Sequence, residues 1–271
     1  MEDNLFLRPP DKLMINNFHK YTMKFLPLKV HPRLFAMLAL SFVIATIMGT
    51  VSHELGHYIM GKSKGYEVKL HYSSVSYKPS QALDLKKFDS LYKADEKKIL
   101  SKESSPEKVS FLKYRDSLGI KIRNEWQREM LFRIGGPLQT MITGTIGILL
   151  LWYNRKKIVI KKELSLKEWL AVILAFFWSR AVLNELICIY YYLVERKVSK
   201  FGDESMISLS MGYHANTLNA TTCIVGTFLL LWVTFFIVPK QQRFSFILAG
   251  ISGSALGVMI WFLWIGPVVL P

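Results

Sequence analysis

The sequence contains little cysteine and little charge for its length. Only two of its 271 residues are cysteines, Cys188 and Cys223, which excludes a secreted scaffold held together by disulfides. Charged residues make up 20% of the chain, hydrophobic residues make up 51%, and the mean hydropathy is +0.24. A soluble enzyme of this length carries more charge, and a disordered chain has far fewer apolar residues, so the composition disfavours both classes.

Charge is missing above all from five long stretches of the chain. Four of them contain no Asp, Glu, Lys or Arg, and the other is interrupted only by Arg180 and Glu185. The stretches are 34–52, 134–153, 169–194, 217–238 and 244–271. A helix needs about 20 apolar residues to cross a bilayer. We therefore expect an α-helical integral membrane protein whose five or so transmembrane helices contact the lipid bilayer.

The net charge of +15 gathers in short segments between these stretches. Six Lys or Arg lie in 1–33 and six in 154–167, and the turn at 239–243 adds two more. With five spans these segments share one side of the membrane, which the positive-inside rule identifies as the cytoplasm. We predict a cytoplasmic N-terminus in a multi-pass protein of the bacterial plasma (inner) membrane. Topology thus explains the positive charge, and no nucleic-acid partner is expected.

The polar part of the chain is an insertion between the first two spans. Residues 66–77 alternate apolar and polar side chains, which predicts a β-hairpin. The residues that follow are rich in Lys, Glu and Asp with spaced Leu and Phe, as in short amphipathic helices or a partly ordered loop. We divide the chain into a basic N-terminal segment (1–33), a first transmembrane helix (34–60), a polar insertion (61–130) and a four-helix transmembrane region (131–271).

The first span ends in a motif with metal-binding spacing, His53-Glu54-Leu55-Gly56-His57. This is H-E-x-x-H, in which the two histidines share one helix face and can both bind one Zn²⁺ ion. Zinc lowers the pKa of a bound water toward neutrality, and Glu54 is placed to take the proton. Ionisable groups are costly in an apolar helix and are typically functional there. We therefore predict zinc ligands at His53 and His57 and a catalytic base at Glu54.

Two histidines leave a catalytic zinc one protein ligand short. Asp203 is our first choice, because it is the only Asp after residue 116 and the topology returns it to the membrane face that holds the motif. The alternative ligands are Glu204, Glu185 and His214. Asp203 can also be read as a solvated loop acid or as the N-cap of the segment that follows.

The third span carries two polar residues on one helix face, Arg180 and Asn184. An arginine inside a membrane needs a partner, which Glu185 or Asp203 can supply. One reading is therefore an interhelical ion pair or hydrogen-bonded lock. The other makes Asn184 or Arg180 a donor to a substrate carbonyl or oxyanion.

These residues resemble the site-2 protease family of intramembrane zinc metalloproteases (peptidase family M50). The likeness rests on the H-E-x-x-H at the end of a membrane helix and the β-prone stretch after it. Gly136-Pro137-Leu138-Gln139-Thr140 is also similar to the family's G-P-x-x-N, with Thr140 in place of Asn. The family usually has Asp-Gly on its later ligand helix, whereas here Glu204 follows Asp203. Family members commonly hold the site toward the cytoplasm, whereas the positive-inside prediction places it toward the outer face.

The resemblance implies a membrane-embedded endopeptidase that hydrolyses a membrane protein or peptide substrate with a zinc-activated water. The alternative is a non-catalytic multi-pass membrane protein, whose zinc-binding or degenerate site serves partner binding or assembly. A transporter that uses Arg180 and Glu185 as pathway charges would not explain the histidine pair.

Overall fold

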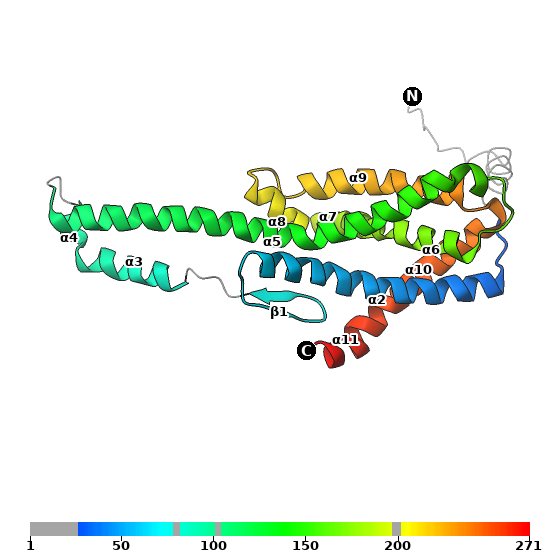
Figure 1. Ribbon diagram of the computed structural model, residues 1–271, viewed down its shortest axis with the longest axis horizontal. Helices are drawn as coiled ribbons and strands as arrows, with labels where there is room; N and C mark the ends of the chain where they lie inside the picture. Colours follow the sequence, from blue (N-terminus) through cyan, green and yellow to red (C-terminus); the bar gives the residue numbers. More distant parts are fainter. Residues whose placement is uncertain (1–26, 78–81, 101–103, 197–201) are drawn as a thin grey trace, which may run out of the picture. The chain divides into compact units, whose positions relative to one another are not determined.

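The computed structural model describes residues 27–77, 82–100, 104–196 and 202–271 (Figure 1). The predicted basic N-terminal segment lies outside the described residues as far as residue 26. Within them the chain is helical apart from one two-stranded sheet. In chain order the elements are α2 (Pro32–Ser63), β1 (Val68–Leu70), β2 (Val75–Tyr77), α3 (Ala82–Ala94), α4 (Glu96–Leu100), α5 (Pro106–Ile158), α6 (Leu166–Ala175), η1 (Phe176–Trp178), α7 (Ser179–Glu195), α8 (Asp203–Ser210), α9 (Thr217–Trp232), η2 (Val233–Ile237), η3 (Lys240–Gln242), α10 (Arg243–Met259), η4 (Ile260–Ile265) and α11 (Gly266–Val269).

Five helical stretches of the described chain are long and apolar enough to cross a membrane. They are Pro32–Ser63, Glu129–Ile158, Leu166–Glu195, Thr217–Ile237 and Lys240–Val269. Along α2, Leu40, Ile44 and Met48 recur every fourth residue with 61%, 54% and 57% of their surface exposed. Such a stripe is costly in water and suits lipid. The structure confirms the predicted fold class, an α-helical integral membrane protein with a small hairpin and helical insertion after its first helix.

The predicted β-hairpin follows directly after α2. Strands β1 and β2 pair antiparallel, with Val68 opposite Tyr77. The Tyr77 ring lies 4.7 Å from the ring of Phe132 on α5, so the hairpin is packed against that helix. Burial and a hydrogen bond with Glu129 raise the pKa of Tyr77 to about 12. The hairpin thus has a fixed place beside the part of α5 that enters the membrane.

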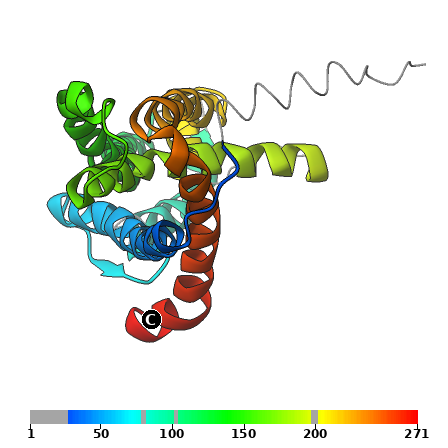
Figure 2. The same cartoon turned by 90° about the vertical axis from the view of Figure 1, so that its right-hand side faces the viewer.

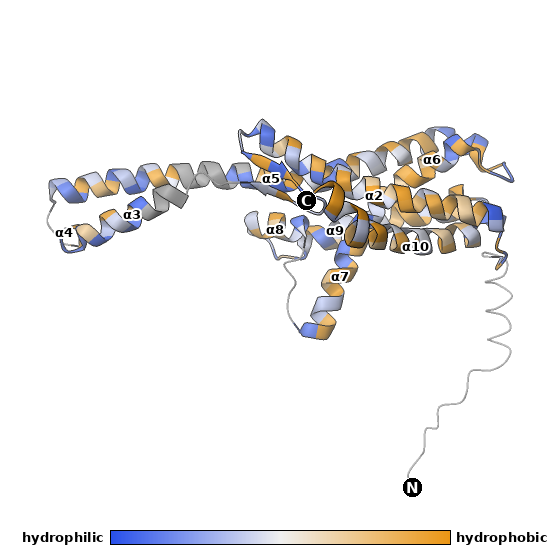
Figure 3. Ribbon diagram, turned by 90° about the horizontal axis from the view of Figure 1, so that it is seen from below, coloured by the Kyte–Doolittle hydropathy of each residue, from blue (hydrophilic) through white to orange (hydrophobic). Residues whose placement is uncertain are grey.

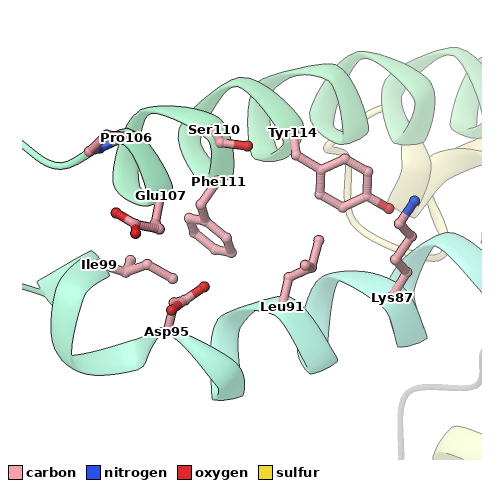
Figure 4. Close-up of a pocket in the computed structure, with 9 residues that line it drawn as sticks. All are labelled: Lys87, Leu91, Asp95, Ile99, Pro106, Glu107, Ser110, Phe111 and Tyr114. Carbon is pink, nitrogen blue, oxygen red and sulfur yellow. The ribbon is translucent and has the colours of Figure 1, made fainter.

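The described residues of the insertion after the hairpin are mostly helical, and its last helix, α5, continues into the second span without a break. Helices α3 and α4 pack against the first turns of α5, where the Phe111 ring lies 5.1 Å from Phe88 and 5.9 Å from Tyr92. Figure 4 shows Leu91 and Phe111 pointing into a hollow of about 530 Å³ between these helices. Glu107, which lines this hollow, forms an ion pair with Lys98 on α4 at 3.1 Å. In Figure 3, α3 and α4 show a mixture of hydrophilic and hydrophobic residues, whereas α2, α6 and α10 are mostly hydrophobic.

The chain divides into two compact units. The first contains the described residues up to Gly49 together with Met141–Val182 and Ile224–Trp264. The second contains Thr50–Thr140, Leu183–Cys223 and Ile265–Pro271. Helices α2, α5, α7 and α9 each contribute to both units, and the H-E-x-x-H motif belongs to the second.

The first unit has an apolar core of aliphatic side chains with an aromatic cluster around Phe246. Phe246 on α10 is 1% exposed, and its ring lies within 5.0–5.7 Å of the rings of Phe42, Trp169 and Phe176. Helix α10 packs closely against α2, as Figures 1 and 2 both show. A Cβ atom on Gly253 would lie only 2.4 Å from the Ala39 carbonyl oxygen. This small-residue contact is how membrane helices approach closely without a hydrophobic driving force.

Candidate metal centre

Three predicted ligands meet at one point of the second unit. The Nε2 atoms of His53 and His57 lie 3.3 Å apart, and the Asp203 Oδ2 atom lies 3.2 Å and 3.1 Å from them. The histidines come from the last turns of α2, and Asp203 is the first residue of α8. Among the described residues this is the group of His, Cys, Asp and Glu side chains placed to hold a metal ion.

The other nitrogen of each imidazole fixes its tautomer. The Nδ1 atom of His57 lies 2.9 Å from the Phe132 carbonyl oxygen, which can only accept, so Nδ1 carries the proton. The Nδ1 atom of His53 lies 2.9 Å from Thr140 Oγ1, and that hydroxyl donates its own hydrogen to the Gly136 carbonyl. Thr140 therefore accepts from His53. Both Nε2 atoms are left with their lone pairs directed at Asp203, as metal-ligating histidines require.

The charges of His53, His57 and Asp203 favour a positive charge between their side chains. Burial raises the pKa of the Asp203 carboxyl group, but hydrogen bonds and charge from His53 and His57 in their protonated form lower it by more, so the net shift is downward. The carboxylate is therefore ionised near neutral pH, and when the two imidazoles are neutral it faces their Nε2 lone pairs. Protons on the imidazoles or a single metal ion can supply the missing positive charge.

The spacing of the three atoms fits zinc. A tetrahedral Zn²⁺ with bonds of about 2.0–2.1 Å separates its ligand atoms by roughly 3.3–3.4 Å. The observed separations of His53 Nε2, His57 Nε2 and Asp203 Oδ2 are 3.1–3.3 Å. Two imidazoles and one carboxylate are also a donor set that catalytic zinc uses. The residues present therefore fit this metal in both chemistry and distance.

Glycines on two helices provide the room for the site. A Cβ atom on Gly136 would lie 2.3 Å from His57 Nε2 and 2.5 Å from His53 Nε2. A Cβ on Gly56 or on Gly135 would lie within 2.4 Å of the other's carbonyl oxygen. Helices α2 and α5 thus touch backbone to backbone here, and the α5 backbone forms one wall of the site. Sequence reasoning missed this role, for which the signal was the pair of glycines inside a helical stretch.

Polar side chains of the neighbouring helices hold α8, and with it Asp203. The Asn184 amide on α7 donates to both oxygens of Glu204, at 3.2 Å and 3.1 Å. The Asn219 amide on α9 donates to Ser205 Oγ at 2.8 Å. Asn219, Ser205 and Glu204 are at most 2% exposed, so these bonds are made away from solvent. Asn184 thus bonds to the helix that carries Asp203, and its role as a substrate contact stays a prediction.

The remaining candidates lie outside the cluster of His53, His57 and Asp203. The Glu204 carboxylate faces Asn184 instead, and the exposed His214 accepts a hydrogen bond from the backbone N–H of Asn216. Among the described residues, Arg180 and Glu185 form no ion pair with each other. Their spacing of five residues turns them to different sides of α7, and each has a buried polar atom without a hydrogen-bond partner in the described chain.

Glu54 is buried beside the two histidines. It is 7% exposed and interacts electrostatically with His57. The histidine side chains are 1% and 6% exposed, whereas the Asp203 side chain is 26% exposed. Water and any substrate therefore reach the cluster from the side of Asp203.

Comparison of the chain with protein-family models, with curated proteins and with solved structures finds no match in any of the three.

Proposed function

We propose that this protein is a zinc-dependent, membrane-embedded endopeptidase of the site-2 protease (M50-like) kind. The observation that carries the proposal is the triangle of His53 Nε2, His57 Nε2 and Asp203 Oδ2, with both histidine tautomers fixed for metal binding. Glu54, which follows His53 in the chain, is buried and interacts electrostatically with His57, which supports its role as the general base. Hydrolytic zinc enzymes use this set of side chains: a pair of histidines and a carboxylate as zinc ligands, and a glutamate as the general base.

In this proposal each residue of the site has a separate task. His53, His57 and Asp203 would hold Zn²⁺, which lowers the pKa of water and polarises a peptide carbonyl. Glu54 takes the proton from the attacking water and passes it to the amine that leaves. Thr140 and the Phe132 carbonyl keep the imidazoles in the required tautomer. The substrate is a peptide segment of a membrane protein, unwound so that its backbone reaches the Asp203 side.

The proposal extends to the setting of the enzyme. The basic segments at 154–167 and 239–243 favour placing that end of the spans in the cytoplasm, together with the N-terminus. The compact five-span architecture suits the plasma membrane of a bacterium. Hydrolysis would then take place at the opposite end of the first span, where the motif lies.

The test replaces Glu54 by its isostere in the purified full-length protein. Parent and Glu54→Gln are reconstituted with a mixture of single-span membrane peptides, and products and bound zinc are measured by mass spectrometry. We expect one zinc per protein in both, and cleavage in the parent alone. Glu96→Gln, an exposed change of the same kind on α4, should leave both properties unchanged.

Two outcomes would contradict the proposal. Cleavage by Glu54→Gln at the parental rate would remove Glu54 from the role of general base. Stoichiometric zinc with no cleavage in the parent would favour the non-catalytic alternative, in which the metal centre serves partner binding or assembly.

A further inference from the structure

A groove of about 840 Å³ lies in the first unit, at the ends of two spans. One wall is the chain that leaves α5, from Ile158 to Lys162, and the other runs from Phe235 to Arg243. We propose that this groove binds an anionic phospholipid, with the phosphate against its lysines and an acyl chain along its aromatic wall.

The charge around the groove is of one sign. Lys161, Lys162, Lys240 and Arg243 line it, and no acidic residue is among its lining, all of which belongs to the described chain. Glu163 follows Lys162 in sequence but does not line the groove. An anion is the ligand that such a surface attracts.

Two of these four cations are already engaged. Lys161 Nζ lies 2.7 Å from the Glu168 carboxylate. Arg243 is 5% exposed and donates to the carbonyl oxygens of Val238 and Phe235, so it closes the end of the π-helical turn η2. Lys162 and Lys240 are exposed and have no ion-pair partner among the described residues. They are the charges left for a ligand.

The apolar wall distinguishes a lipid from a free anion. Phe236 and Val159 line the groove with 67% and 61% of their surface exposed. The spans that end here stop at Ile158 and Ile237, so the groove lies where apolar helix gives way to polar chain. Phosphate groups of lipids lie at this level of a bilayer, and basic pockets between membrane helices are suited to anionic headgroups. A zwitterionic lipid would bring its own ammonium group against the lysines.

The test compares two pairs of lysines in the same basic segment. Full-length protein in detergent is titrated with phosphatidylglycerol, and bound lipid is counted by native mass spectrometry. Loss of two surface lysines lowers affinity for an anionic lipid by roughly 30-fold, which we expect for Lys162→Gln with Lys240→Gln. The matched control, Lys156→Gln with Lys157→Gln, removes two exposed lysines that do not line the groove and should change affinity less than about threefold.

Further arms separate the possible ligands. Phosphatidylcholine with the same acyl chains should bind much more weakly, and inorganic phosphate should not displace phosphatidylglycerol. Phe236→Ser should weaken the binding of the lipid. Equal losses in the two lysine pairs, equal binding of phosphatidylcholine, or full displacement by inorganic phosphate would each overturn the proposal. Zinc content, which belongs to the second unit, should be the same in all these variants.

Discussion

Most of the buried polar side chains of the described residues lie in the second of the two units. The first packs rings against one another around Phe246 and brings helices together at Gly253. The second buries His53, Asn184, Glu204, Ser205 and Asn219, which are all at most 9% exposed. An apolar contact tolerates small changes of shape, whereas a buried polar group that loses its partner has a large cost. In the first unit, the stability of the protein should therefore be most sensitive to the loss of buried side-chain volume. In the second unit, metal binding should be sensitive to the loss or addition of a single atom.

The largest effect is expected from one methyl group at the metal centre. In Gly136→Ala the new Cβ would lie 2.3 Å from His57 Nε2, so the histidines cannot keep their positions and zinc binding should be lost. The measurement is zinc per protein by elemental analysis after gel filtration. Gly119→Ala is the matched control on the same helix, because its Cβ would meet nothing within 4 Å. Full zinc occupancy in Gly136→Ala would show that α5 does not wall the site.

The next largest effect, on the stability of the protein, is expected from a cavity in the core of the first unit. Phe246→Ala removes a ring that is 1% exposed and should destabilise the protein by about 3–5 kcal/mol. Thermal unfolding in detergent measures the loss, and the folded protein should still bind one zinc. Phe228→Ala deletes a ring that is 69% exposed and should change stability far less. If Phe246→Ala removed zinc without lowering the melting temperature, the contrast between the units would fail.

The most delicate test concerns the hydroxyl group of Thr140. Thr140→Val keeps the shape of the side chain but removes the acceptor for His53 Nδ1, and loss of such a partner lowers zinc affinity about 10–100-fold. Competition with a chromophoric chelator measures the affinity. Thr140→Ser retains the hydroxyl and should stay close to the parent. Equal affinities for the valine and serine variants would mean that the hydrogen bond has no part in orienting His53.

Two kinds of feature could be predicted from the sequence. They are those that depend on the spacing of residues along a helix and those that depend on the scarcity of charged residues. Long stretches with little or no charge identified the five spans, and the four-residue spacing placed His53 and His57 on one helix face. Asp203 stood out because acidic residues are rare in the second half of the chain. Each of these inferences needed only the chain itself and the periodicity of a helix.

What could not be predicted depends on which helices meet. Glycine is common in membrane helices, so the pair Gly135-Gly136 indicates a close helix contact but does not show that Gly136 faces two imidazoles. The bond from Asn184 to Glu204 joins α7 to α8 and needs the tertiary arrangement to be known. Arg180 and Glu185 were attractive as an ion pair because both are charges in an apolar span, yet five residues along a helix point them apart.

The unbroken course of α5 has a practical consequence. Its part before the second span, from Pro106 to the residue preceding Glu129, rises about 35 Å at 1.5 Å per residue. Helices α3 and α4 pack on its first turns, so this part of α5 is a long helical extension outside the span Glu129–Ile158. An antibody fragment raised against the exposed surface of α3, where the side chains of Asp89 and Lys93 are 61% and 72% exposed, would provide a landmark for particle alignment in electron microscopy.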